Sequence, residues 1–277
     1  MMKKFLLATA AVLASTSAYA ADYAVVHPFY TPAQGKFVST TELEYEHSLI
    51  RAKVFDVKRI DSEITLSEEV KYGVTDDVQV GLTIGRDWSK RKMKSNTAVT
   101  GPAGRDYTNS WGLNVGYNII NDGKAFLNAS LGYAQTVTAD NDPANNDEEH
   151  AKIIDLEFLG GYNFDAATVF GSIGYTRQVD GEKLVEKSKI YSLEAGVFKA
   201  FNDQISAYTT LSADIDETKD AEERTYWWNV GADYSISKKM AVGVNAGYML
   251  ANDKDDATMV PETHSAYKLG VDFTVEF

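Results

Sequence analysis

The chain contains no cysteine, and its 277 residues include only five prolines and four histidines. Without cysteine it can form no disulfide, no cysteine-ligated zinc or iron–sulfur centre and no thiol nucleophile. Basic residues are also scarce, with 27 Lys and Arg against 40 Asp and Glu and a formal net charge of −13. Because nucleic-acid binding needs a basic face, this balance argues against a nucleic-acid partner.

Long apolar runs are missing as well. The run Phe5–Ala14 follows two lysines and precedes an A-x-A motif that ends at Ala20. A helix that crosses a bilayer takes about 18 apolar residues, so we predict a signal peptide over residues 1–20, cleaved after Ala20. No later run approaches that length. The mature chain is therefore expected to be an exported soluble protein or a closed β-barrel, because only helices and closed barrels satisfy the backbone in lipid.

What the sequence does have is a strict alternation of apolar and polar residues from Lys36 onward. In residues 111–119, for example, Trp, Leu, Val, Tyr and Ile alternate with Gly and Asn. Such alternation indicates β-strands with one apolar and one polar face. We count twelve segments of this kind, at residues 36–50, 57–74, 78–88, 106–119, 124–137, 150–164, 168–179, 187–200, 204–215, 223–235, 239–251 and 263–277.

The lengths and connections of these segments favour a membrane barrel. Globular strands average about five or six residues, whereas a transmembrane strand needs about nine to eleven, as most of these have. Short turns such as 121–123 alternate with longer links such as 89–105, the pattern of periplasmic turns and external loops. We predict an all-β fold, a transmembrane antiparallel β-barrel of about twelve strands in an up-and-down meander, spanning residues 36–277 after a short lead segment at 21–35.

Aromatic residues on the apolar register gather at strand ends, where the rings of membrane barrels form interfacial girdles. One predicted girdle lies at the periplasmic side: Tyr72, Tyr117, Tyr162, Tyr234 and Phe277. The other lies at the outer side: Trp88, Trp111, Tyr133, Tyr175, Tyr191, Tyr226, Tyr248 and Tyr267.

Two charged residues break the apolar register. Lys199 is near a strand end and can snorkel, whereas Glu68 predicts a β-bulge or a weaker register in the second strand.

The last strand, Tyr267–Phe277, resembles the C-terminal assembly signal of Gram-negative outer-membrane proteins. The residues that carry the resemblance are Lys268, Gly270, Phe273, Val275 and the terminal Phe277. Together with the leader, the chain resembles small porin-like outer-membrane β-barrels. The resemblance implies an outer-membrane location, contact with lipid and lipopolysaccharide, and recognition of the last strand by the barrel assembly machinery. It does not identify a solute, because barrels of this size include channels, a phospholipase and autotransporter translocators.

The polar register, which would face the lumen, is acidic. Its predicted acids are Glu42, Glu44, Glu46, Glu69, Asp87, Asp155, Glu157, Glu194, Asp214, Asp233, Asp272 and Glu276. Its bases are chiefly Lys71 and Lys268. Since two bases cannot neutralise twelve acids, we expect hydrated carboxylates and a path that favours cations. The first strand forms an acidic ladder at residues 42–46, for which the second strand offers only Lys71 and Lys58.

Two further features of the polar register concern the width of the lumen. Glycines recur on it, and we expect them to ease curvature and to leave space inside the barrel. Large aromatic residues share it and could narrow the path: Phe126, Phe170, Tyr208 and Trp227.

Catalytic and metal-binding patterns are weak. His264 and Ser265 are the one adjacent His–Ser pair, and successive strand residues point to opposite faces, which argues against a hydrolase site. The oxygen-rich segment Asp140–Glu149 lacks the spacing of a calcium loop. We predict a narrow passive channel, not an enzyme, with no cofactor and no metal, that passes small hydrophilic solutes or cations. Two alternatives stay open: a filled barrel with a structural or surface-interaction role, and an outer-membrane hydrolase.

Overall fold

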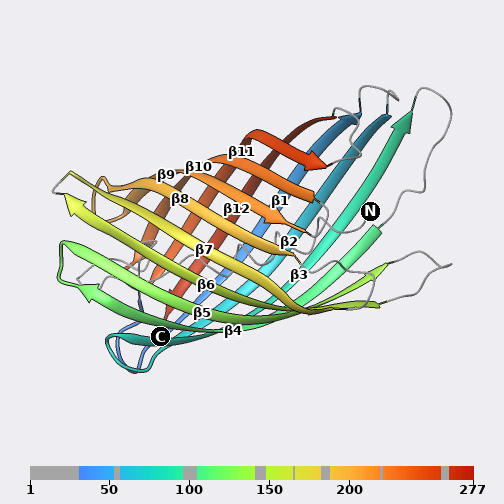
Figure 1. The fold of residues 1–277 in the computed structure, drawn as a ribbon. Coiled ribbons are helices and arrows are strands. Elements are labelled where there is room, and N and C mark those ends of the chain that lie inside the picture. The colour runs from blue at the N-terminus through green and yellow to red at the C-terminus, as the bar shows by residue number, and fades with distance from the viewer. Residues whose placement is uncertain are drawn as a thin grey trace.

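The computed structural model describes residues 31–52, 57–95, 105–140, 148–164, 166–181, 188–218, 221–256 and 262–277. These parts of the chain form a closed antiparallel β-barrel of twelve strands in which each strand pairs with the next and the last pairs with the first (Figure 1). The predicted leader and residues 21–30 of the predicted lead segment lie outside the described residues. No described helix is long and apolar enough to cross a membrane.

Each predicted segment corresponds to one strand, which confirms the fold class and the meander. The strands are β1 Phe37–Ala52, β2 Val57–Gly73, β3 Val78–Ser95, β4 Arg105–Asn121, β5 Ala125–Asp140, β6 Glu148–Phe164, β7 Ala167–Gly181, β8 Lys189–Ala200, β9 Ile205–Glu217, β10 Ala221–Ser237, β11 Met240–Asp256 and β12 Glu262–Glu276. The largest difference is at β3, which continues seven residues beyond the predicted end at Trp88. These residues are polar apart from Met93, so they carry no apolar alternation, yet β3 stays paired with β2 up to Ser95.

The two faces of the wall are inverted relative to a soluble protein. Large apolar side chains stand on the outer face, where Leu131 and Ile173 expose 56% and 63% of their surface. Polar side chains such as Asn128 and Asp155 are buried on the inner face. A lipid-facing apolar band around a polar interior is the arrangement of transmembrane β-barrels.

The predicted girdles are visible as ring contacts between neighbouring strands. At the outer end, Trp111 of β4 lies 5.7 Å from Tyr133 of β5 between ring centroids. Farther round the barrel, Tyr175 of β7 lies 5.3 Å from Tyr191 of β8. At the periplasmic end, the corresponding contact joins Phe37 to Tyr72. The rings therefore mark two heights on the outer wall.

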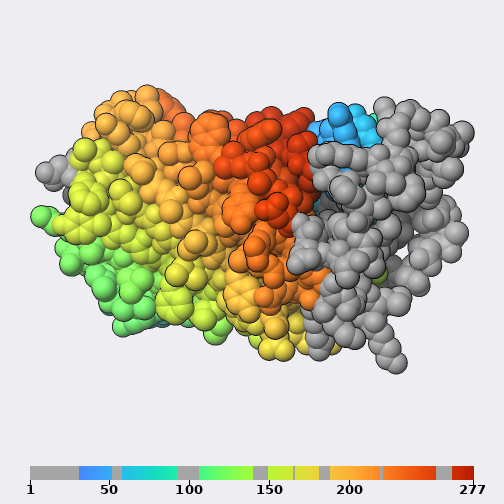
Figure 2. Space-filling model, turned by 45° about the horizontal axis from the view of Figure 1, so that its top comes forward, coloured from blue at the N-terminus to red at the C-terminus, as the bar shows by residue number. Residues whose placement is uncertain are grey.

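The barrel closes between its two end strands. β1 and β12 pair from Val38 opposite Glu276 to Ala52 opposite Glu262 without a register shift. In Figure 2 the red of β12 borders the blue of β1 on the outer surface. The backbone N–H of Phe277 donates to the carbonyl oxygen of Phe37 at 2.9 Å, so the chain ends as part of the seam.

The ladder between β11 and β12 is shorter than the others. It runs from Met240 opposite Val275 and stops at Tyr248 opposite Tyr267. A bulge against β10 leaves Leu250 as an extra residue of β11. Beyond this bulge, the outer half of β11 pairs with β10. The outer half of β12 pairs with β1 instead. Above the two tyrosines, the outer halves of β11 and β12 are therefore not paired with each other.

Side chains that accept backbone hydrogen bonds shape the short turns. Between β4 and β5, the carboxylate of Asp122 accepts from the N–H groups of Lys124 and Ala125 at 2.9 and 2.7 Å, and Gly123 has a φ of +88°. These donors hold the pKa of Asp122 below its usual range. Asn202 accepts two backbone hydrogen bonds in the same way before β9. Asn and Asp favour turns because they can make such local bonds.

The described part of the lead segment lies against the inner wall at the periplasmic end. The N–H of Gly35 donates to Gly73 O at 2.8 Å, and the N–H of Gly73 donates to Lys36 O at 3.0 Å. Thr31 and Pro32 are buried. A Cβ at position 73 would collide with the carbonyl oxygens of Pro32 and Ala33, so this close approach requires glycine.

Candidate functional site

The interior of the barrel is the candidate site. The acids that the sequence places on the polar register all lie on the inward face: Glu42, Glu44, Glu46, Glu69, Asp87, Asp155, Glu157, Glu194, Asp214, Asp233, Asp272 and Glu276. The ladder of β1 stands beside β12, where Glu42 faces Asp272 across the strands and Glu46 faces Lys268.

Several charged residues that the alternation did not predict also lie on this face. Asp61 and Glu63 of β2 are buried inside the barrel, and Arg59 and Arg91 also face inward. Their inward position follows from the register of Glu69 and Lys71, which runs unbroken through β2. These positions were not predicted because Glu68 left the register of β2 in doubt, and because Arg91 lies past the predicted end of the third strand.

Lys58 was assigned to the wrong face. It lies opposite Arg51, one residue away from the inward Arg59, and alternation therefore places it on the outward register. The base that β2 offers at this end is Arg59. Among the residues whose side chains the structure describes, the inward bases of β2, β3 and β12 are Arg59, Lys71, Arg91 and Lys268.

Glu68 does not mark a bulge, so that prediction was wrong. β2 pairs with β1 and β3 without a register shift, and Glu68 projects outward. Its carboxylate accepts hydrogen bonds from the hydroxyls of Ser39 and Thr41 on β1. These two donors satisfy a charge that would otherwise stand alone on the apolar wall. Lys199, the other exception, also faces outward, and its Nζ lies 5.6 Å from the ring centroid of Phe201.

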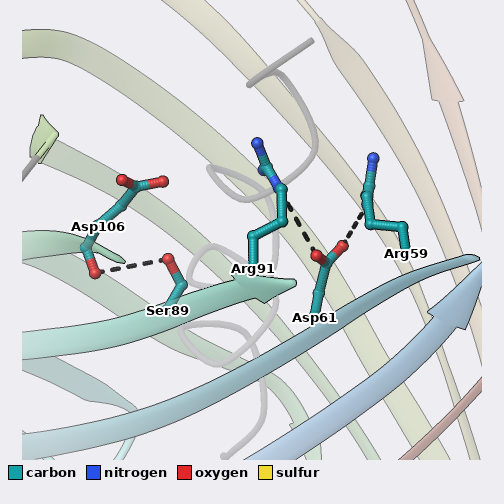
Figure 3. Close-up of polar contacts among 5 residues, drawn as sticks. All are labelled: Arg59, Asp61, Ser89, Arg91 and Asp106. Atoms are coloured by element: carbon teal, nitrogen blue, oxygen red, sulfur yellow. Dashed lines mark hydrogen bonds and ion pairs between the residues drawn. The ribbon is translucent and has the colours of Figure 1, made fainter. Parts of the chain in front are cut away.

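Asp61 holds two arginines from neighbouring strands. Its Oδ2 lies 2.6 Å from Nε of Arg59 on β2, and its Oδ1 lies 3.6 Å from Nε of Arg91 on β3. The Asp61 side chain is only 4% exposed. Figure 3 shows the two arginines reaching it from either side. One buried carboxylate therefore engages both arginines of this wall.

Ser89 and Asp106 continue the polar lining beside this cluster. The Ser89 hydroxyl on β3 donates to the backbone carbonyl of Asp106 on β4 at 3.4 Å (Figure 3). The contact adds a side-chain bond to the pairing of β3 with β4 at this end.

The two inward lysines have acidic partners on their own side of the barrel. Lys71 Nζ lies 3.0 Å from the carboxylate of Glu69 on the same strand. Lys268 Nζ lies 4.0 Å from Glu44 and 5.3 Å from the ring centroid of Trp227. Each lysine thus has a close acidic partner, while further acids of the same face surround it.

An apolar layer occupies the wall formed by β5 to β9, across the barrel from β1, β2 and β12. It consists of Phe126, Leu159, Phe170 and Phe198 from β5 to β8, with Tyr208 of β9 packed against them. The inward aromatics of the sequence analysis are thus mostly gathered in one place. Trp227 is separate from this layer, beside Lys268.

The inward glycines do not leave open space as expected. A Cβ at Gly161 would collide with the ring of Phe126, and one at Gly231 would collide with the ring of Tyr208. On the acidic side, Asp155 occupies the space over Gly132 in the same way. Each glycine makes room for a side chain of the adjacent strand, so this space is filled by the wall itself.

Charges on facing walls act on one another. Lys268 of β12 interacts electrostatically with Glu194 of β8 and Asp214 of β9. Lys71 of β2 interacts in the same manner with Glu157 of β6. These pairs join strands that are not neighbours in the barrel.

Two further predicted features concern chemistry. His264 and Ser265 stand on opposite faces of β12, with Ser265 exposed on the outer wall. Among the described residues, no group of three or more His, Asp or Glu side chains is arranged to hold a metal ion.

Comparison with protein families gives a match over most of the barrel. Residues 39–256 match the family model of the Gram-negative porins. The chain belongs to this family. No curated protein sequence matches this porin. Its barrel is accordingly that of an outer-membrane protein.

Solved structures share the fold of this porin at low sequence identity. The COG4313 outer membrane channel from Pseudomonas putida F1 has a TM-score of 0.61 and 16% identity, covering 94% of this chain and 100% of that one. The translocator domain of the autotransporter NalP from Neisseria meningitidis has a TM-score of 0.55 and 13% identity, covering 87% and 88%. The beta domain of the Bordetella autotransporter BrkA has a TM-score of 0.54 and 10% identity, covering 87% and 98%. These similarities extend to the barrel alone.

Proposed function

We propose that this porin is a narrow passive channel for small hydrophilic solutes, with a preference for cations and without enzymatic activity. The observation that carries the proposal is the excess of carboxylates on the inward face. Of the inward bases, Arg59, Arg91, Lys71 and Lys268 are already engaged by Asp61, Glu69 and Glu44. Acids such as Glu42, Glu46 and Glu157 have no ion pair among the described residues, and water or mobile cations would compensate their charge, because buried carboxylates without counter-charges are costly.

The acidic ladder of β1 is the strongest single element of this charge. Glu42, Glu44 and Glu46 lie on one face, and Lys268 is the one base paired with any of them in the described strands. A passing cation would experience an attractive potential along these three residues, whereas an anion would be repelled.

Reversal potentials in planar bilayers under a KCl gradient test the proposal. Wild-type protein should give a cation-selective potential. Replacement of Glu42, Glu44 and Glu46 by Gln should shift it toward zero. A matched control, D76N/D77N/D203N, removes three acids from exposed periplasmic turns and should shift it less. Anion selectivity in the wild type would overturn the proposed preference.

A filled barrel is the second candidate, and the apolar layer of β5–β9 is the observation that favours it. If the interior were closed, folded protein would insert into bilayers without ion conductance. The same recordings therefore separate the two candidates. The hydrolase alternative lacks such support, since His264 and Ser265 are on opposite faces.

We also infer that outer-membrane assembly depends on β12. Its outward face carries Phe273, Val275 and Phe277, and its inward face carries Lys268 and Gly270. A single strand with this alternation can present both faces to an assembly machinery before the seam with β1 closes. Lipid and lipopolysaccharide would then surround the outer wall.

A further inference from the structure

Glu46 and Glu63 are direct partners across β1 and β2 on the inward face. Side chains in directly opposite positions have Cβ atoms about 4.5–5.5 Å apart, and like charges there destabilise a sheet. We call these two residues the acid pair. A barrel that keeps two carboxylates at this spacing gains from any cation that settles between them.

The neighbouring bases do not neutralise Glu63. Asp61 engages both arginines of this wall, as Figure 3 shows. The inward neighbours of Glu63 include two acids, since Glu46 lies opposite it on β1 and Asp87 lies two residues from its β3 partner Ser89. Glu46 has Lys268 across the β1–β12 seam, but the Nζ of that lysine lies next to Glu44.

Glu63 is itself buried. Glu63 is only 8% exposed. No residue described by the structure forms a hydrogen bond or ion pair with the Glu63 carboxylate. A carboxylate in this state must take its donors from water or from a solute. Its inward register directs it to the lumen beside Glu46, so donors must come from something in the lumen.

We propose that the acid pair is a binding subsite for the primary ammonium group of an organic cation. This inference rests on the proposed channel function, since it names a class of solute for it. A primary ammonium carries one positive charge and three N–H donors, which suits two facing carboxylates. A metal ion fits less well, because the described acids are not arranged as a metal cluster.

The shape of the ladder suggests a linear cation with two ammonium groups. Alternate residues of a strand are about 6.6 Å apart along its axis, so Glu42 and Glu46 place carboxylates at intervals along the lumen. A chain such as butane-1,4-diamine can contact the acid pair with one end and another ladder acid with the other.

The test is block of potassium current through single channels by butane-1,4-diamine, compared with tetramethylammonium. Tetramethylammonium has the charge but no N–H donor. The diamine should block at concentrations where tetramethylammonium does not. The variant E46Q/E63Q should raise the blocking concentration by about tenfold or more, because hydrogen bonds to charged groups are lost. The control E68Q removes an acid from the same strand on the opposite face and should leave block unchanged.

The outcomes separate this inference from the channel proposal. A conducting barrel that the two cations block equally, or whose diamine block survives in E46Q/E63Q, overturns the acid pair alone. A barrel without conductance overturns the channel proposal. In that case thermal stabilisation of the detergent-solubilised barrel by the diamine still tests the subsite, since a ligand that binds the folded state raises its melting temperature. Loss of that stabilisation in E46Q/E63Q supports the subsite, and its absence in the wild type refutes it.

Discussion

Phe277 and Phe37 exchange backbone hydrogen bonds at the periplasmic end of the seam, at 2.9 Å and 3.5 Å. The last residue of the chain thus completes the pairing of β12 with β1. The Phe277 ring is also exposed on the outer wall.

Deletion of Phe277 should therefore impair barrel formation. It removes both hydrogen bonds and the aromatic end of the alternation on β12. Heat-modifiable mobility of outer-membrane fractions on gels measures folded barrel, and we expect a clear reduction. F277Y keeps the backbone and an aromatic ring, and it should fold normally. Equal amounts of folded barrel in the deletion strain and the wild type would refute the role of this residue.

Gly231 should not tolerate a side chain as long as Tyr208 covers it. The substitution G231A should destabilise the barrel by about 1–3 kcal/mol, the usual cost of overpacking. Urea unfolding in lipid vesicles measures this change. In a Y208A background the space is open, so G231A should cost much less. Equal costs in both backgrounds would show that the ring and the glycine are not coupled.

Ser39 and Thr41 should matter only in the presence of Glu68. Removal of both hydroxyls by S39A/T41A leaves the outward carboxylate without its donors and should destabilise the barrel by about 1–3 kcal/mol. In an E68L background the same double substitution should be nearly neutral. The coupling free energy comes from a double-mutant cycle. A value near zero would contradict the hydrogen bonds.

Asp61 should influence ion selectivity through the arginines that it holds. D61N removes one negative charge and also releases Arg59 and Arg91, which can then turn toward Glu63. The reversal potential should consequently move farther toward anions than it does in E69Q, where the loss of one acid releases only Lys71. Equal shifts in the two variants would show that the arginines stay in place without Asp61.

The alternation of the sequence was sufficient for the fold, because lipid on one side and water on the other impose the same period on every strand. It failed where that constraint ends. Beyond Trp88, β3 leaves the apolar belt, and its polar residues look like a loop although the strand continues to Ser95. Glu68 satisfies its charge with hydroxyls from β1, which a reading of β2 alone cannot reveal.

Contacts inside the barrel depend on the register between strands. The alternation within β1 places Glu46 on the inward face, and the alternation within β2 does the same for Glu63. Only the pairing of β1 with β2 sets the two residues opposite each other. The same holds for Asp61 with Arg91, and for Tyr208 with Gly231. Such pairs are invisible in the sequence because they join residues from different strands at heights that the turns and loops determine.

The early end of the β11–β12 ladder at Tyr248 and Tyr267 should be visible in amide hydrogen exchange. Beyond this point each strand keeps one neighbour, so alternate N–H groups face the gap and lack a strand partner. Amides of residues 249–256 and 262–266 should alternate between slow exchange, where the N–H donates to β10 or β1, and fast exchange, where it meets water. Single amides in this outer part of the wall would then exchange without unfolding of the barrel. Amides on the periplasmic side of the two tyrosines would exchange only when the whole barrel unfolds.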